Sequence, residues 1–341
     1  MNANVAVPPA DALLVIDSAD RSSSSSETGV VFAVPQTQPY NNFRLNKAQN
    51  ILQGSFTQLE LTEINFPYAI PNVNPRNNTF WIQVNKGGLQ TAQISLPVGI
   101  GLNLSPQALR DAVDNALQVS AVGTAIGITW IVSYDTITQG FTIQAQDTAV
   151  PIDFYTFALY PIDPASVGVV PVGKSLLDVM GFNSLTNWTG ITTQTLGKQS
   201  IGAPMTYTKY IDIVSDALTY FQNVRDGSSK KSSTSNIICR LYISDENSSQ
   251  PASNIYWNGV SAVEYSSTFP VGNIPFIIHR QFANPKVFKW VKNNSISAID
   301  IKLFDDVGEP LYFPPAIPPF PLLNPSLSIP DFQITFKATE E

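Results

Sequence analysis

Short runs of alternating apolar and polar residues, separated by proline and glycine, fill most of this sequence. A period of two sends successive side chains to opposite faces of a strand, as a half-buried β-strand requires. The clearest runs repeat an inward residue at Thr57, Leu59 and Leu61, at Ile299, Ile301 and Leu303, and at Phe332, Ile334 and Phe336. Many short strands joined by such turns favour a mainly β protein, folded as a sandwich or jelly roll.

One region departs from this pattern, and we predict that about residues 98–200 form a small α+β unit inserted into the β fold. It contains SPQALRDAVDNAL, in which Ser105 suits the N-cap and Pro106 the first helical position. Strand-like runs follow in ITWIVSY and FTIQAQ, and the turn over 135–140 between them indicates a hairpin. The apolar residues at helical spacing are Leu109, Val113, Ala116 and Leu117.

The stretch GVVPVGKS, residues 168–175, matches the phosphate-loop pattern of nucleotide hydrolases letter for letter. A working phosphate loop follows a buried parallel strand and opens a long helix, whose backbone amides face the phosphates. Here a loop over 161–167 precedes the stretch, Pro171 removes one amide, and the next helical segment ends at Gly181. The context therefore argues against a nucleotide site.

We favour a structural role for this stretch, in which Ser175 caps the segment SLLDVMG and forms a capping-box-like pair with Asp178. Nucleotide hydrolysis through Gly173, Lys174 and Ser175 is the less favoured alternative.

The chain contains one histidine and one cysteine, which limits the chemistry open to it. Any catalytic triad or dyad would have to use His279, and transition-metal sites lack ligands. His279 and Cys239 both lie in strand-like runs, FIIHRQF and NIICRLYI, and we interpret Cys239 as a buried small hydrophobic residue. We predict no catalytic residues, no metal ligands and no cofactor, and therefore no enzyme.

The tightest acidic group consists of Asp305, Asp306 and Glu309 in FDDVGEPLY. Such carboxylates could bind calcium, but their spacing is not that of an EF-hand loop. We favour a turn around Gly308 with solvated carboxylates, and calcium binding remains the alternative.

Charged residues make up only 13% of the chain, about half of the roughly 25% that is usual. The net charge is -7, Lys and Arg total 19, and the densest basic pair is Lys230-Lys231, so direct nucleic-acid binding is not expected. No run approaches the roughly 18 apolar residues of a membrane span, and the N-terminus does not resemble a signal peptide. We expect a soluble protein made in the cytosol, with partner proteins covering part of its surface.

Residues 310–330 are too rich in proline for an interior strand or a helix. We expect an extended, polyproline-like segment that docks onto a neighbouring subunit.

Several stretches share a further likeness. They are LLVIDSADR, LTEINFPYAIPNVNPRNNTFWIQ, SPQALRDAVDNAL, ITWIVSYDTITQGFTIQAQ, SLLDVMGF, TKYIDIVSDALTYFQNVRDGSS, RQFANPKVFKW and AIDIKLFDDVGEPLY. Together they resemble the penton and minor capsid proteins of nucleocytoplasmic large DNA viruses and of virophages.

This resemblance implies a single jelly roll with an inserted α+β domain, in a structural virion protein made in the host cytoplasm. The expected parts are an arm over 1–10, a jelly roll over 11–97 and 201–341, and an insertion over 98–200. The resemblance also implies a homopentamer at the capsid vertices, beside the major capsid protein. The alternatives are another minor capsid protein or a vertex protein that binds host-surface glycans through its insertion.

Overall fold

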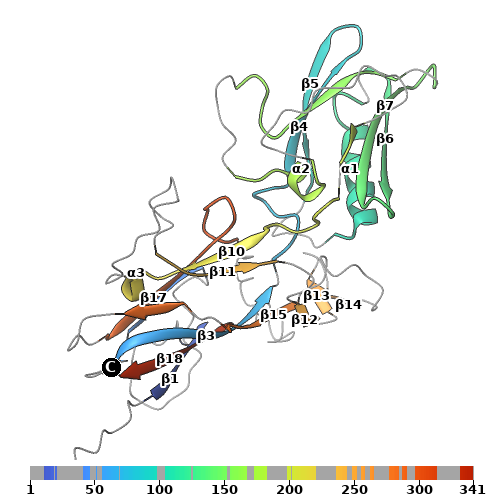
Figure 1. The fold of residues 1–341 in the computed structure, drawn as a ribbon. Helices are drawn as coiled ribbons and strands as arrows, with labels where there is room; N and C mark the ends of the chain where they lie inside the picture. The colour runs from blue at the N-terminus through green and yellow to red at the C-terminus, as the bar shows by residue number, and fades with distance from the viewer. Residues whose placement is uncertain are drawn as a thin grey trace, which may run out of the picture.

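The computed structural model contains two bodies of secondary structure, which Figure 1 shows as a β-rich lower part and an upper part that carries α1. The residues that it describes are 11–18, 20, 41–46, 51, 56–68, 70–97, 104–123, 126–151, 154–166, 173–182, 198–200, 202–219, 236–243, 248–251, 255–257, 262–264, 276–283, 286–289, 296–312 and 331–340.

Two antiparallel sheets form the lower body. The first has the strand order β1-β18-β3-β15-β12, and β16 also pairs with β3. Its strands are β1 Asp11–Asp17, β3 Phe56–Tyr68, β12 Ser248–Pro251, β15 Phe276–Gln281, β16 Val287–Lys289 and β18 Gln333–Glu340. The second sheet has the order β11-β10-β17-β2. Its strands are β2 Asn42–Asn46, β10 Tyr210–Val214, β11 Ile237–Tyr242 and β17 Ala298–Phe304.

The order of these strands is that of a jelly roll. Strands β1, β2 and β3 alternate between the two sheets, and so do β15, β17 and β18. The last strand, β18, lies between β1 and β3, so the two ends of the described chain share one sheet. Antiparallel strands that exchange between two packed sheets in this way make the Greek keys of a jelly roll. The predicted fold class, a mainly β jelly roll with an inserted α+β unit, is confirmed.

The core of the sandwich comes from alternate residues of both sheets, as the sequence period predicted. The inward residues Ile299, Ile301 and Leu303 of β17 are completely buried. The ring of Phe332 lies 5.8 Å from Phe43 of the second sheet and 5.4 Å from Phe66 of the first, so it joins the two sheets. On β18 itself the inward residues are also completely buried, and they are Ile334, Phe336 and Ala338.

A β-bulge at Thr62 changes the phase of the long strand β3. Before it Leu59 and Leu61 face the core, and after it Ile64 and Phe66 do so. The register of β18 skips one residue of β3 at this point, and the Thr62 hydroxyl instead donates to the carbonyl of Thr335 at 3.0 Å. A bulge adds one residue to one strand of a pair and shifts the facing of those that follow. The predicted alternation therefore holds only over the first half of β3.

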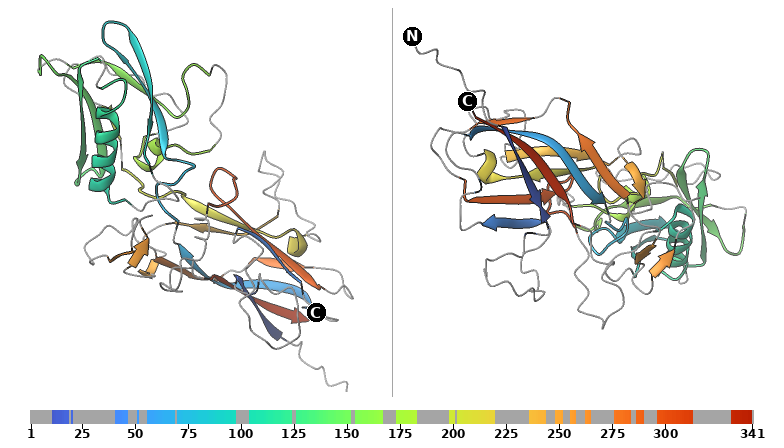
Figure 2. Two further views of the ribbon diagram at one scale, coloured as in Figure 1. Left: turned by 180° about the vertical axis from the view of Figure 1, so that it is seen from behind. Right: turned by 90° about the horizontal axis from the view of Figure 1, so that it is seen from below.

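The upper body has its own core and its own sheets. One sheet has the order β5-β4-β8, and the other has the order β6-β7-β9, with α1 packed on β6. Figure 2 shows α1 beside the β6–β7 pair in both views. Its elements are β4 Thr79–Asn85, β5 Leu89–Ser95, α1 Pro106–Gln118, β6 Ile128–Asp135, β7 Gly140–Asp147, β8 Phe157–Tyr160, α2 Leu176–Val179 and β9 Lys198–Gln199. The remaining elements of the chain are α3 Asp216–Thr219 and the pair β13 Ile255–Trp257 and β14 Ala262–Glu264.

Helix α1 forms where the sequence predicted it. The Ser105 hydroxyl accepts the N–H of Ala108 at 3.2 Å, and Pro106 takes the first helical position. Leu109, Val113 and Leu117 are completely buried against the second core. An N-cap and one apolar stripe are sufficient to specify this helix.

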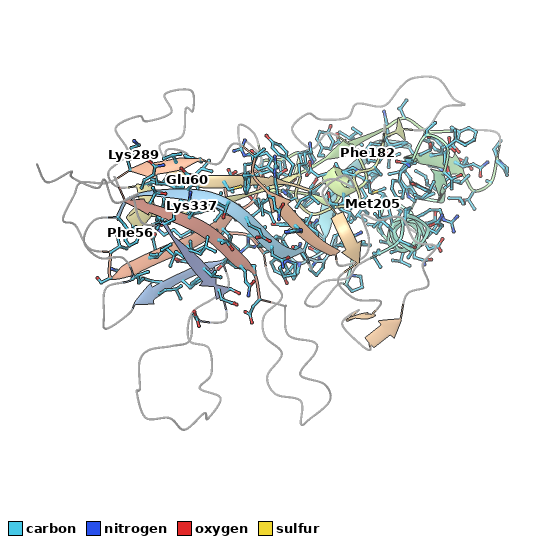
Figure 3. All side chains as sticks on the ribbon, turned by 60° about the horizontal axis from the view of Figure 1, so that its bottom comes forward. Phe56, Glu60, Phe182, Met205, Lys289 and Lys337 are labelled. Atoms are coloured by element: carbon cyan, nitrogen blue, oxygen red, sulfur yellow. The ribbon has the colours of Figure 1, made fainter. Side chains whose placement is uncertain are left out.

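The second core begins earlier in the chain than the predicted limit at residue 98. It begins at Val73, includes residues of β4 and β5 such as Phe80 and Ile94, and extends to Met205. Phe182 and Met205 both lie within this body in Figure 3. The predicted limits of 98–200 therefore separate β4 and β5 from the core that they help to form. We propose that the inserted unit spans about residues 73–205, between β3 and β10.

Some predictions concern residues outside the described part of the chain. These are the arm over 1–10, the basic pair Lys230-Lys231 and residues 313–330.

Candidate functional site

The chain enters the inserted unit through the turn PNVNPRNN, which a group of buried asparagines holds in place. The Asn74 N–H donates to the side chain of Asn77 at 2.7 Å, and the Asn77 amide donates to the carbonyl of Asn72 at 2.8 Å. Asn72 in turn exchanges two hydrogen bonds with the backbone of Leu104, just before α1. Because these amides are at most 1% exposed and are hydrogen-bonded, they fix the path between the two bodies.

The acidic group after β17 forms a tight turn, as predicted. The Asp305 carboxylate accepts the N–H groups of Val307 and Glu309, both at 3.0 Å, and Gly308 has a positive φ of 84°. The expectation that its carboxylates are solvated is wrong for Asp305, which is only 1% exposed. Burial raises the pKa of the Asp305 carboxyl. Asp305 is therefore part of the interior, whereas Gly308 of the same turn is exposed.

Lys174 explains why these carboxylates can be buried. Its ammonium group forms an ion pair with Asp306 and donates to the carbonyl of Tyr207. It also lies 4.5 Å from the centre of the Tyr207 ring, within range of a cation–π contact. The Tyr207 hydroxyl donates to Asp305 at 3.3 Å. We call these four residues, together with Thr208, the joint, because they connect the inserted unit to the jelly roll.

The joint is strongly desolvated. The side chain of Lys174 is 6% exposed and that of Asp306 is 12% exposed. Burial lowers the pKa of Lys174, although Asp306, Asp305 and Asp178 oppose the shift. Burial also raises the pKa of Tyr207. A cation and carboxylates removed from water in this way require one another, because either charge alone would be costly.

The phosphate-loop alternative fails on the geometry around residues 173–182. The preceding strand β8 pairs antiparallel with β4, and α2 has only four residues. Ser175 caps α2 as predicted, and its N–H donates to Asp178 at 2.8 Å. Since Asp306 and Tyr207 already occupy the Lys174 ammonium, the described part of this stretch does not build a nucleotide site. Residues 167–172 lie outside the described chain.

An open hollow of about 450 Å³ lies beside the joint, lined by Arg76, Gly173, Glu309 and Pro310. The Arg76 guanidinium donates to the carbonyl of Pro310 at 2.5 Å and lies 5.5 Å from the centre of the Tyr312 ring. Arg76 therefore fastens the entry turn to the chain that leaves β17. Sequence reasoning missed Arg76, Tyr207 and Thr208, since no local pattern relates them to the acidic turn.

The single histidine and cysteine lie apart from the joint. His279 on β15 contacts Glu63 on the neighbouring strand β3, with 2.7 Å between Nε2 and Oε1, and both side chains are substantially exposed. Cys239 on β11 is buried, as predicted, and burial raises the pKa of its thiol to about 12. The described contacts of both residues are with neighbouring strands, and none of these contacts places a nucleophile beside His279.

Among the described residues, no cluster of three or more His, Cys, Asp or Glu side chains could hold a metal ion. No helix in this part of the chain has the length and apolar character to cross a membrane.

No protein-family profile matches the chain, and no curated protein matches it by sequence. Among solved structures it is similar to the mavirus penton protein, with 9% sequence identity and a TM-score of 0.46 over 88% of this chain and 91% of that chain. It is also similar to a chain in the cryo-electron microscopy structure of the Sputnik virophage, with 12% identity and a TM-score of 0.41 over 97% and 98% of the two chains. The strand order, rather than this likeness, establishes that the larger body of the chain is a jelly roll.

Proposed function

We propose that this chain is a structural protein of a virion, a vertex penton that assembles as a homopentamer and contacts the major capsid protein. The observation that carries the proposal is a complete jelly roll interrupted between β3 and β10 by a separately packed unit. Jelly rolls are a common building block of viral capsids.

The sequence stretches that resemble penton and minor capsid proteins support this proposal. They fall on successive elements of the fold, from β1 and β3 through α1 and the β6–β7 hairpin to β10 and β17. The resemblance therefore involves both bodies in the expected order.

The edge strand β1 offers a contact for a neighbouring subunit. It ends the first sheet in the described chain and exposes Leu13 by 73% and Val15 by 52%. A ring of identical subunits needs two different surfaces that meet head to tail. We infer that β1 contributes to one of them.

The test is the mass of the purified full-length chain, measured by sedimentation velocity or mass photometry. We expect a species of five subunits, and Val15→Glu to shift it toward monomer. Ile137→Glu, at a 91% exposed position of the β6–β7 turn, is the matched control and should leave the pentamer intact. A strict monomer that never co-purifies with virions would contradict the proposal.

Host attachment is the second candidate, and the separate core of the inserted unit favours it. A projecting unit with its own core can carry a binding surface without disturbing the capsid shell. We expect the full-length chain to bind defined glycans on an array if this function is present. Absence of glycan binding alongside pentamer formation would leave the structural role alone.

The expected docking of the proline-rich segment onto a neighbouring subunit cannot be tested by truncating the chain before it. Residues 313–330 precede β18, which lies between β1 and β3, so truncation after Tyr312 would remove a central strand. Replacing 313–328 with a glycine–serine sequence of equal length keeps that strand. If the segment docks onto a neighbour, pentamer formation weakens; unchanged assembly would contradict the docking.

A further inference from the structure

Lys174 differs from the other lysines whose ion pairs are described. Lys86, Lys302 and Lys337 each pair with an aspartate at exposures of 23%, 31% and 40%, and their partners raise the pKa of the amine. Lys174 is 6% exposed, and burial lowers the pKa of its amine. A buried lysine of this kind spends more time as the neutral amine, which is a nucleophile.

The carboxyl group that faces this amine is held from several sides. The Thr208 hydroxyl lies 2.7 Å from one oxygen of Asp306, and the N–H of Lys209 donates to the other at 3.3 Å. The Lys209 N–H, and the Thr208 hydroxyl when it turns to Asp306 rather than to the carbonyl of Tyr210 at 2.8 Å, would stabilise the negative charge that develops on these oxygens if the carbon were attacked. The Lys174 amine also donates to the carbonyl of Tyr207, and this second contact helps to hold it beside Asp306.

A second carboxyl group stands next to the pair. Asp305 is buried, receives the Tyr207 hydroxyl, and interacts electrostatically with Lys174. Because burial raises its pKa, this group can both accept and return a proton. The pair Lys86 and Asp147 has no such neighbour among its described contacts, which are Tyr155 and backbone groups.

We propose that Lys174 and Asp306 condense to an intramolecular isopeptide bond, which covalently joins the inserted unit to the jelly roll. Within the ion pair one proton passes from Lys174 Nζ to an Asp306 oxygen, the lone pair of Nζ attacks Cγ, and the N–C bond forms. Asp305 takes a proton from the nitrogen and delivers it to the departing hydroxyl, so the C–O bond breaks and one water leaves. Nothing is oxidised or reduced, and no other reactant is needed. Fixed contact between the two groups supplies the proximity that such a reaction requires.

The bond would have a clear mechanical consequence. Lys174 directly precedes α2, whose residues Leu176 and Leu177 are fully buried in the second core, whereas Asp306 follows β17 of the jelly roll. A covalent link at this point would hold the two bodies together when either one opens locally. This inference does not depend on the proposed capsid function.

The experiment compares intact masses of the full-length chain and its Lys174→Arg variant under denaturing conditions. After correction for the substitution, we expect the wild-type protein to be lighter by one water molecule. Trypsin should then fail to cleave after Lys174 and should release residues 111–198 joined to residues 303–337. Cleavage after Lys86 serves as the internal control, because its exposed ion pair should stay non-covalent.

The variants Asp305→Asn and Asp306→Ala show whether the bond can be lost while the protein still folds. Both should restore the unmodified mass, and circular dichroism should show that Asp305→Asn retains its β structure. A wild-type chain with no mass difference and normal cleavage after Lys174 would overturn the proposal and leave a buried ion pair only. A water loss that peptide mapping places elsewhere would overturn it as well.

Discussion

Lys86 and Asp147 form an ion pair of 2.9 Å that joins the β4–β5 turn to the end of β7. Lys86 also donates to the carbonyl of Gly127 at 2.8 Å, and the Tyr155 hydroxyl donates to Asp147. The pair therefore connects the two sheets of the inserted unit.

We expect Asp147→Asn to lower the melting temperature at neutral pH. The hydrogen bond from Lys86, followed by that from Tyr155, holds the pKa of Asp147 far below its usual 3.8. A carboxyl with a lowered pKa in the folded state stabilises the protein above its unfolded pKa, and the contribution is lost as pH falls through the folded value. The difference between wild type and variant should shrink below about pH 4. Asp111→Asn, which alters an exposed pair with Arg110, should change little.

Lys174→Met should destabilise the protein by about 3–5 kcal/mol, because it leaves the buried Asp305 and Asp306 with neither the Lys174 cation nor the bond proposed to form from it. The double variant Lys174→Met/Asp306→Leu replaces the pair with apolar groups and should recover the part of that loss that the unpaired Asp306 charge causes. Chemical denaturation of the three proteins measures both effects. Equal instability of the single and double variants would show that the joint tolerates no apolar replacement.

Gly181→Ala should destabilise the protein more than Gly87→Ala does. Both glycines have positive φ, 82° and 65°, which costs a residue with Cβ about 1 kcal/mol or more. A Cβ at Gly181 would also lie 2.9 Å from the carbonyl oxygen of Gly202, whereas one at Gly87 would meet nothing within 4 Å. Thermal unfolding of both variants measures the difference in stability that the close contact at Gly181 causes. Equal decreases in melting temperature would contradict a steric effect there.

Phe336→Ala should cost about 3–5 kcal/mol, the usual range for removing a large aromatic side chain from a core. Phe336 is completely buried in the jelly roll, and its ring lies 6.3 Å from that of Phe288. Val287→Ala, next to Phe288 but 40% exposed, is the matched control and should stay within about 0.5 kcal/mol of wild type. Urea unfolding measures both, and similar losses would show that the core lies elsewhere.

The Cys239 thiol should be unreactive toward a disulfide reagent at pH 8 in the folded protein. Burial raises its pKa to about 12, so almost no thiolate forms, and access is also blocked. Spectrophotometric titration should find one reactive thiol only after denaturation. Fast reaction of the native chain would mean that β11 opens readily.

Local sequence patterns were sufficient to predict the short elements of this protein. Strands alternate at period two where Ile299 and Ile301 face inward, and α1 begins at its cap Ser105. Ser175 likewise caps α2, as its place before LLDVMG predicted. These features depend on residues a few positions apart, whose propensities and spacing act before any tertiary contact forms.

Other features depend on partners that are distant in the sequence, and local patterns did not predict them. The bulge at Thr62 exists because β18 pairs with β3 across most of the chain, and β4 and β5 join the second core because β8 pairs with β4. Asp305 and Asp306 are buried beside Lys174, and Lys174 belongs to the inserted unit, far from them in the sequence. Burial and pairing energies depend on which segments meet in space, and no local pattern in the sequence contains that information.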